Sequence, residues 1–167
     1  MKTISHTLFV LLVTSFISVN AATFSPYKGH LKSPSFILND VSGKSHNLKD
    51  YQGQVVLVQF WATYCTPCRT EMPSMNRLQK KLEKQGFKIL AINMAEEKQE
   101  LEKFIAEVRP EFTILHDSDG AVLQKWKVFA APASFLLNKT GEIKYVLYGG
   151  VEWDSPEIIK VIEAILN

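Results

Sequence analysis

The sequence predicts an α/β fold in which strands and helices alternate around a central sheet. Residues 55–60 are almost all apolar and rich in β-branched side chains, which is typical of a strand buried on both faces. Directly after it, from residue 68 to residue 82, apolar side chains recur at the spacing of one helix face. Strand and helix patterns continue to alternate downstream, and this alternation favours a layered α/β architecture.

The remaining elements can be assigned in order. A hairpin opens the fold, because short strand patterns at 36–40 and 44–48 flank the turn Ser42-Gly43. Gly86 ends the first helix. The later elements are a strand at 88–93, a helix at 97–109, a strand at 112–115, a short helix at 119–127, paired strands at 133–137 and 143–147, and a last helix capped by Ser155. The antiparallel pair makes the predicted sheet mixed.

Length and composition are those of one globular domain. The chain has 167 residues, and 46% of them are hydrophobic. The formal net charge is +2 and no basic run or stripe occurs, which argues against a nucleic-acid partner. The two cysteines belong to one Cys-x-x-Cys motif, so no other disulfide can form within one chain. Stability must therefore come from the hydrophobic core.

The first 21 residues are predicted to be a secretory signal. Lys2 supplies the positive end, residues 8–13 open an apolar stretch, and residues 19–21 suit cleavage after Ala21. An uncleaved membrane anchor is the alternative, but the apolar run is shorter than the ~20 residues that a membrane span needs. We therefore expect a location outside the cytoplasm, where disulfides persist. Residues 23–33 are weakly patterned and are expected to be loose.

The Cys-x-x-Cys pair lies where the buried strand gives way to a helix, a setting typical of a redox motif. Cys65 falls at the first helical turn, where unpaired backbone N–H groups and the helix dipole favour a thiolate. Cys68 lies one turn further along and shares the inward face of Met72. We therefore expect Cys65 to be the attacking thiol and Cys68 to be the resolving thiol. Pro67 suits a helix start.

The segment from Phe60-Trp61-Ala62 through Cys65-Thr66-Pro67-Cys68-Arg69-Thr70-Glu71-Met72-Pro73 resembles the TlpA-like, ResA-like and DsbE-like thiol–disulfide oxidoreductases of the thioredoxin superfamily. The similarity covers a domain spanning residues 33–167. It implies a thioredoxin-like fold: a central mixed β-sheet flanked by helices, with an N-terminal β-hairpin and an inserted helix. It also implies a periplasmic enzyme without cofactor or metal that reduces protein disulfides, in some relatives during cytochrome c maturation. Its partners would be a protein disulfide or dithiol substrate and a membrane-embedded or periplasmic electron donor.

The resemblance also implies a substrate-binding surface around the motif. Thioredoxin-like folds carry a cis-proline facing the redox pair, and Pro132 stands at the matching place. A cis bond there would project the backbone of Ala131 toward the sulfurs, where it could pair with an extended substrate chain. We expect Trp61, Tyr64, Thr66 and Pro67 to complete this surface, with Trp61 as part of the packing next to the active site; Tyr64 replaces the tryptophan that most relatives have.

Glu96 is the candidate for proton transfer. ResA-like proteins have a glutamate at the place that we match to Glu96, beside the resolving thiol. A buried Glu96 could relay a proton to or from Cys68. The alternative is a glutamate that stabilises the start of a helix. Gln59 replaces the buried acid of ordinary thioredoxins, and a neutral amide cannot act as a base.

Three other functions stay open. The same fold could form disulfides, because reduction potentials in this superfamily span roughly −270 to −120 mV. The cysteine pair could bind copper or zinc together with a histidine, although His116 has no motif around it. A peroxidase of the peroxiredoxin type would need a Pro-x-x-x-Thr-x-x-Cys loop, and Ala62 occupies the threonine position.

Overall fold

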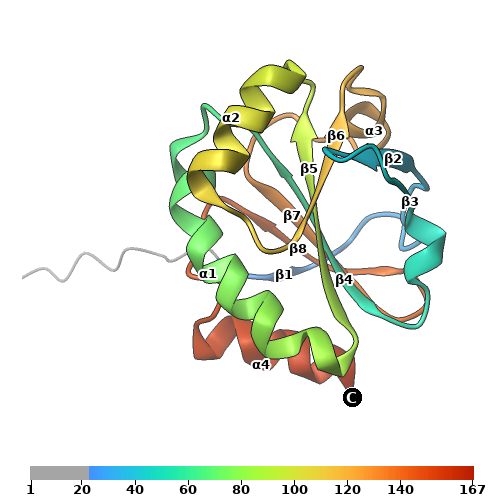
Figure 1. The fold of residues 1–167 in the computed structure, drawn as a ribbon. Helices are drawn as coiled ribbons and strands as arrows, with labels where there is room; N and C mark the ends of the chain where they lie inside the picture. The colour runs from blue at the N-terminus through green and yellow to red at the C-terminus, as the bar shows by residue number, and fades with distance from the viewer. Residues whose placement is uncertain (1–22) are drawn as a thin grey trace, which may run out of the picture.

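The computed structural model describes residues 23–167, so the predicted signal lies outside the described residues. One eight-stranded sheet has the order β1-β8-β7-β4-β5-β6-β2-β3 and is flanked by helices (Figure 1). The strands are β1 (Ser25–Pro26), β2 (Ile37–Asp40), β3 (Ser45–Asn47), β4 (Val55–Trp61), β5 (Phe87–Met94), β6 (Thr113–Asp117), β7 (Ala133–Leu137) and β8 (Ile143–Tyr148). The helices are η1 (Leu48–Tyr51), α1 (Thr66–Leu82), η2 (Glu83–Gln85), α2 (Lys98–Val108), α3 (Ala121–Lys125) and α4 (Pro156–Leu166).

Strand β4 lies inside the sheet. It is the buried strand that was predicted at residues 55–60 and on which the predicted fold class depends. It pairs in parallel with β5 and antiparallel with β7, so the sheet is mixed. All seven of its residues are buried. Leu57 and Trp61 point into one core, whereas Val58 and Phe60 point into the other. The prediction of a strand buried on both faces is confirmed.

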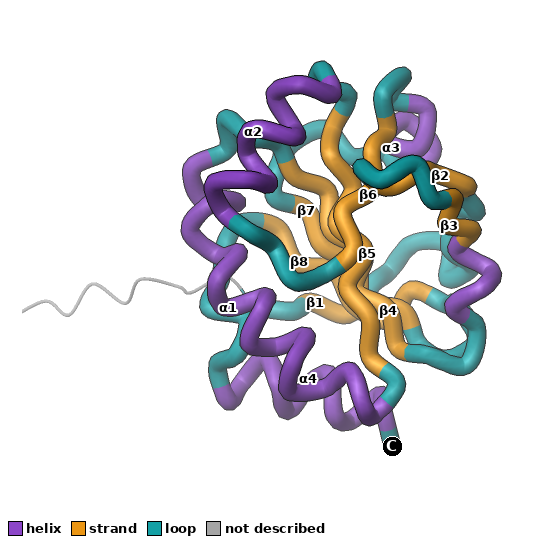
Figure 2. Tube along the Cα trace, viewed as in Figure 1, coloured by secondary structure: helices purple, strands orange, loops and turns teal. Residues whose placement is uncertain are grey.

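Helices cover both faces of this sheet (Figure 2). Leu78 of α1, Phe104 of α2 and Ile162 of α4 belong to the core on one face. Leu48 of η1 and Trp126, which follows α3, belong to the core on the other face. The predicted α/β class, a mixed sheet between layers of helices, is confirmed.

The predicted N-terminal hairpin forms, but the segment ahead of it is not loose. Strands β2 and β3 pair antiparallel, and β2 attaches the hairpin to β6. Strand β1 pairs with β8 at the opposite edge. Phe24 explains why the expectation of a loose lead-in was wrong, because its ring packs edge-on against Trp153 at 5.9 Å. Such contacts join residues far apart in sequence, and no local pattern reveals them.

Among residues 23–167, no helix combines the length and the hydropathy that crossing a bilayer requires.

Candidate active site

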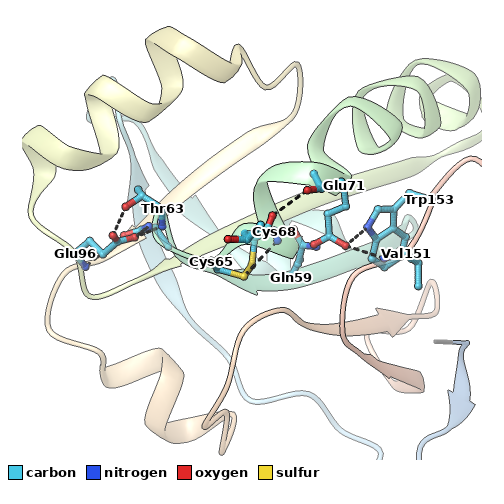
Figure 3. The surroundings of a disulfide bond; sticks show 11 residues. Gln59, Thr63, Cys65, Cys68, Glu71, Glu96, Val151 and Trp153 are labelled. Carbon is cyan, nitrogen blue, oxygen red and sulfur yellow. Dashed lines mark hydrogen bonds between the residues drawn. A yellow bond between two sulfur atoms is a disulfide. The ribbon is translucent and has the colours of Figure 1, made fainter. Parts of the chain in front are cut away.

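The cysteine pair lies at the N-terminus of α1 and forms a disulfide with an S–S distance of 2.03 Å (Figure 3). Cys65 is the N-cap residue, and its Sγ accepts a hydrogen bond from the backbone N–H of Cys68 at 3.3 Å. Cys65 keeps 8% of its surface exposed, whereas Cys68 is completely buried. The two sulfurs are therefore unequal, as the sequence predicted: the outer one meets the free N–H groups of a helix start, and the inner one faces the core.

The peptide bond between Ala131 and Pro132 is cis, as expected. Phe60 pairs with Ala133 where β4 ends and β7 begins, so Pro132 lies at the edge of the sheet from which the cysteine motif emerges. The carbonyl of Pro132 accepts a hydrogen bond from Gly149 N at 3.0 Å, which connects this loop to the end of β8. Three segments distant in sequence thus meet around the disulfide.

A buried glutamate that the sequence analysis did not select lies behind the disulfide. Glu71 of α1 accepts hydrogen bonds from Gln59 Nε2 at 2.6 Å, from Trp153 Nε1 at 2.9 Å and from Val151 N at 3.2 Å. Burial raises the pKa of Glu71 from 4.5 to about 7, and these three hydrogen bonds oppose the rise. The site therefore contains a carboxyl group that can gain or lose a proton near neutral pH.

Glu71 follows Cys68 by three residues, so the two side chains project from the same side of α1 one turn apart. The signal for Glu71 was present in the sequence as the spacing Cys68-x-x-Glu71. It was missed because a glutamate on an amphipathic helix usually lies on the exposed face. Gln59 also gains a role, because the amide donates to the carboxylate of Glu71.

The structure places Glu96, the predicted proton-transfer residue, at the loop before the cysteine motif. Its carboxylate accepts hydrogen bonds from Thr63 N at 2.7 Å, from Asn93 Nδ2 at 2.6 Å and from Thr63 Oγ1. Figure 3 shows Glu96 directed at Thr63, on the opposite side of the disulfide from Glu71. These hydrogen bonds fix the loop that precedes Cys65.

Comparison with known proteins gives consistent matches. Residues 30–146 match the AhpC/TSA family. The chain is 42% identical over 117 residues to the thiol-disulfide oxidoreductase ResA of Geobacillus kaustophilus, covering 70% of this chain and 67% of the relative. It is 31% identical over 146 residues to the ResA of Bacillus cereus, covering 81% and 84%. A Chlorobium tepidum crystal structure assigned as the thiol:disulfide interchange protein DsbE is 34% identical, covers 86% of this chain and 100% of its own, and superposes with a TM-score of 0.78.

The chain belongs to the ResA-like thiol–disulfide oxidoreductases of the AhpC/TSA family. This membership explains why the disulfide, the cis-proline and the thioredoxin-like sheet occur together in one chain. It also agrees with the resemblance inferred from the sequence.

The expected substrate-binding residues of this ResA-like protein do not all reach solvent. Trp61 is not part of the exposed surface, because it is completely buried and its ring packs on Phe104 at 4.8 Å; it belongs to the packing next to the active site. The side chain is buried because Trp61 lies on the face of β4 that α1, α2 and α4 cover. Thr66 and Pro67 are exposed, and Tyr64 is 77% exposed.

Phe129 is a further exposed aromatic side chain that the sequence analysis did not select. It lies three residues before Pro132 and is 92% exposed. Tyr148, another exposed aromatic residue, is paired with Ala133 directly after Pro132. Exposed aromatic side chains on the segments next to an active-site proline are typical of a binding surface.

Proposed function

We propose that this protein reduces disulfides of substrate proteins outside the cytoplasm. The observation that carries the proposal is the inequality of the two sulfurs: Cys65 caps the helix and keeps 8% of its surface exposed, and Cys68 is completely buried one turn from a carboxyl group whose pKa is about 7. A thiolate that solvent can reach can attack a substrate, whereas a completely buried thiol can reach only the sulfur next to it.

The exchange proceeds in two steps. The Cys65 thiolate attacks one sulfur of the substrate disulfide, so a mixed disulfide forms and the other substrate sulfur leaves as a thiolate and takes a proton. Cys68 then loses its proton and attacks Cys65 Sγ. The bond between Cys65 and the substrate breaks, and the second substrate sulfur leaves. Two electrons have passed to the substrate, and the Cys65–Cys68 disulfide is the oxidised product.

Glu71 is the group that we propose to accept the proton of Cys68. It lies one helical turn from Cys68 and is buried, and its pKa of about 7 matches proton transfer at neutral pH. The same carboxyl group can return the proton when a donor protein reduces the disulfide again. We assign this step to Glu71 and not to Glu96, because Glu71 lies one turn from Cys68 on the same helix, whereas the Glu96 carboxylate is directed at Thr63 on the other side of the disulfide (Figure 3).

The direction of the reaction and its location outside the cytoplasm are supported by the sequence and not by the geometry of the site. The predicted signal supports a periplasmic location, and the TlpA-like and ResA-like resemblance supports reduction. A membrane-embedded or periplasmic donor protein would return electrons to the disulfide. Cytochrome c maturation is the process that the resemblance suggests.

A trapping experiment tests the proposal. In Cys68→Ser, Cys65 can attack but cannot be released, so a substrate protein should accumulate as a mixed disulfide that mass spectrometry identifies. Cys65→Ser is the matched control and should trap nothing. Redox titration against glutathione fixes the direction: a potential near −270 mV supports a reductase, whereas one near −120 mV would identify a disulfide-forming oxidant instead.

The AhpC/TSA match makes a peroxidase the second candidate. Ala62, at the position where the peroxidase loop has threonine, is buried and offers no hydroxyl group. We expect hydrogen peroxide to be consumed no faster by the reduced protein than by Cys65→Ser. For the metal-carrier alternative, no three His, Cys, Asp or Glu side chains within residues 23–167 are grouped to hold a metal ion; metal analysis of protein purified under reducing conditions tests it.

We propose that substrate segments bind across Tyr64, Phe129 and the backbone of Ala131. The three segments that surround the disulfide, residues 62–67, 128–132 and 147–151, contain no charged residue. A neutral surface with exposed aromatic rings fits an extended substrate segment whose side chains beside the reactive cysteine are apolar.

Phe129→Ser should lower kcat/KM for a protein disulfide by roughly tenfold, since an aromatic contact at the centre of an interface contributes more than about 1 kcal/mol. Tyr64→Ser should act in the same direction. The rate with a small aromatic disulfide such as DTNB should stay unchanged for Phe129→Ser. Ile37→Ser is the control, because Ile37 is 65% exposed but lies on the N-terminal hairpin. Equal losses for Phe129→Ser and Ile37→Ser would contradict the proposed surface.

A further inference from the structure

The segment between β8 and α4, residues 149–154, contacts both sides of the active site. At one end, Gly149 N donates to the carbonyl of Pro132 at 3.0 Å. Further along, Val151 N and Trp153 Nε1 donate to Glu71 Oε2 at 3.2 and 2.9 Å. This segment therefore supplies two of the three hydrogen bonds that the Glu71 carboxylate accepts (Figure 3).

One row of side chains on α1 holds the segment. Glu71, Ser74 and Arg77 recur every third residue, so they lie along one side of the helix. Ser74 Oγ accepts from Trp153 N at 3.0 Å. Arg77 donates from Nε to Asp154 Oδ2 at 2.5 Å and from Nη2 to Asp154 Oδ1 at 3.1 Å, and Nη2 also binds Glu152 Oε1. Glu71 and Ser74 are buried, and Arg77 is exposed.

The arrangement leaves the segment little freedom. A Cβ atom on Gly150 would lie 3.0 Å from Pro67 Cβ and 3.5 Å from Glu71 Oε2, so the backbone there fits closely against the cysteine turn. A single exposed ion pair stabilises a protein little. The Arg77 guanidinium differs from a single ion pair, because two of its nitrogens bind the Asp154 carboxylate and one of them also binds Glu152.

We propose that Arg77 is a positioning residue for Glu71. By binding Glu152 and Asp154, its guanidinium holds residues 151–153 where their N–H groups meet the buried carboxylate. The effect of Arg77 on disulfide exchange rests on the proposed function of Glu71, but its effect on the Glu71 carboxyl group does not.

Loss of Arg77 should raise the pKa of Glu71, since hydrogen bonds that favour the ionised form would weaken. Few charged groups complicate this expectation. The side chain of β4 that faces Glu71 is the neutral Gln59. On α1, the neighbour one turn away is the buried Cys68. The segment of residues 149–154 contributes two charged groups, Glu152 and Asp154. The other cationic side chains of α1, which are Arg69, Lys80 and Lys81, are at least partly exposed.

The direct test is a 13C NMR titration of the Glu71 side-chain carboxyl carbon in the oxidised protein. Arg77→Gln should raise the midpoint by about 0.5–1 pH unit, the size expected when one hydrogen bond to a carboxylate weakens. Lys103→Gln is the control, because it removes an exposed ion pair with Glu100 on α2 and should leave the midpoint unchanged.

A double variant separates positioning from simple charge. Glu152→Gln with Asp154→Asn removes two negative charges and leaves Arg77 in place. A field effect alone would lower the Glu71 midpoint, whereas a loosened segment would raise it. A rise in both Arg77→Gln and the double variant supports positioning. A fall in the double variant, or an unchanged midpoint with only a lower melting temperature, would overturn it.

The exchange reaction gives an independent readout. If Glu71 accepts the proton of Cys68, the pH profile of resolution should move upward with the carboxyl midpoint in Arg77→Gln. If the carboxyl midpoint moves while Glu71→Gln exchanges at the normal rate, Arg77 still positions Glu71, and the proposed catalytic role of Glu71 is the part that fails.

Discussion

Replacing Cys65 with serine is expected to slow the reduction of a protein disulfide by roughly a thousandfold or more, the scale on which removal of a catalytic nucleophile acts in other enzymes. A serine hydroxyl is not ionised near neutral pH and cannot form the mixed disulfide. Helix-terminal N–H groups that favour a thiolate at position 65 have no comparable effect on a hydroxyl group. The insulin-reduction assay with a chemical reductant measures the loss.

Cys68→Ser should behave differently, because the outer sulfur remains. It should still attack one substrate disulfide per molecule and then stop at the mixed disulfide. Alkylation of the reduced wild-type protein provides the control: Cys65 should react at least roughly a hundred times faster than Cys68, since Cys68 is completely buried and Cys65 is not. Equal alkylation of the two thiols would contradict the proposed mechanism.

The parts of the structure that local pattern determines could be predicted from the sequence. Strand β4 was predicted because five of the six residues 55–60 are apolar, three of them valine, which leaves few other choices. The start of α1 at the cysteine motif follows from Pro67 and from the helical spacing behind it. The cis bond before Pro132 was inferred from family resemblance, and the sequence pattern by itself favours trans.

The buried polar contacts could not be predicted in the same way. Glu71 is buried because Gln59, Val151 and Trp153 all direct donors at it, and two of these residues lie 80 and 82 positions away. Without those partners in view, a helical glutamate is expected to face solvent. Glu96 was selected from its position after a strand and from the resemblance to ResA-like proteins, and the structure adds that its carboxylate binds Thr63 and Asn93.

Glu71 should make the stability of the oxidised protein depend on pH. Its pKa is about 7 in the folded protein and 4.5 when unperturbed, so the folded state binds the proton more tightly than the unfolded state. The stabilisation is fully present below pH 4.5 and is lost as the pH rises through 7. A difference of this size corresponds to about 3 kcal/mol. We therefore expect the free energy of unfolding to fall by about 3 kcal/mol between pH 4 and pH 8 through Glu71.

Glu71→Gln isolates this contribution, because glutamine does not titrate. Its amide nitrogen would face the donating amide of Gln59, and this adds a cost that does not vary with pH. The quantity to measure is therefore the difference in unfolding free energy between Glu71→Gln and the wild type, by urea denaturation at several pH values. It should move by about 3 kcal/mol in favour of the variant as the pH rises. The exposed Glu83→Gln should show no such trend. Parallel curves for Glu71→Gln and the wild type would mean that the carboxyl group titrates alike in both states, and Glu71 could then not hold a proton for Cys68 at neutral pH.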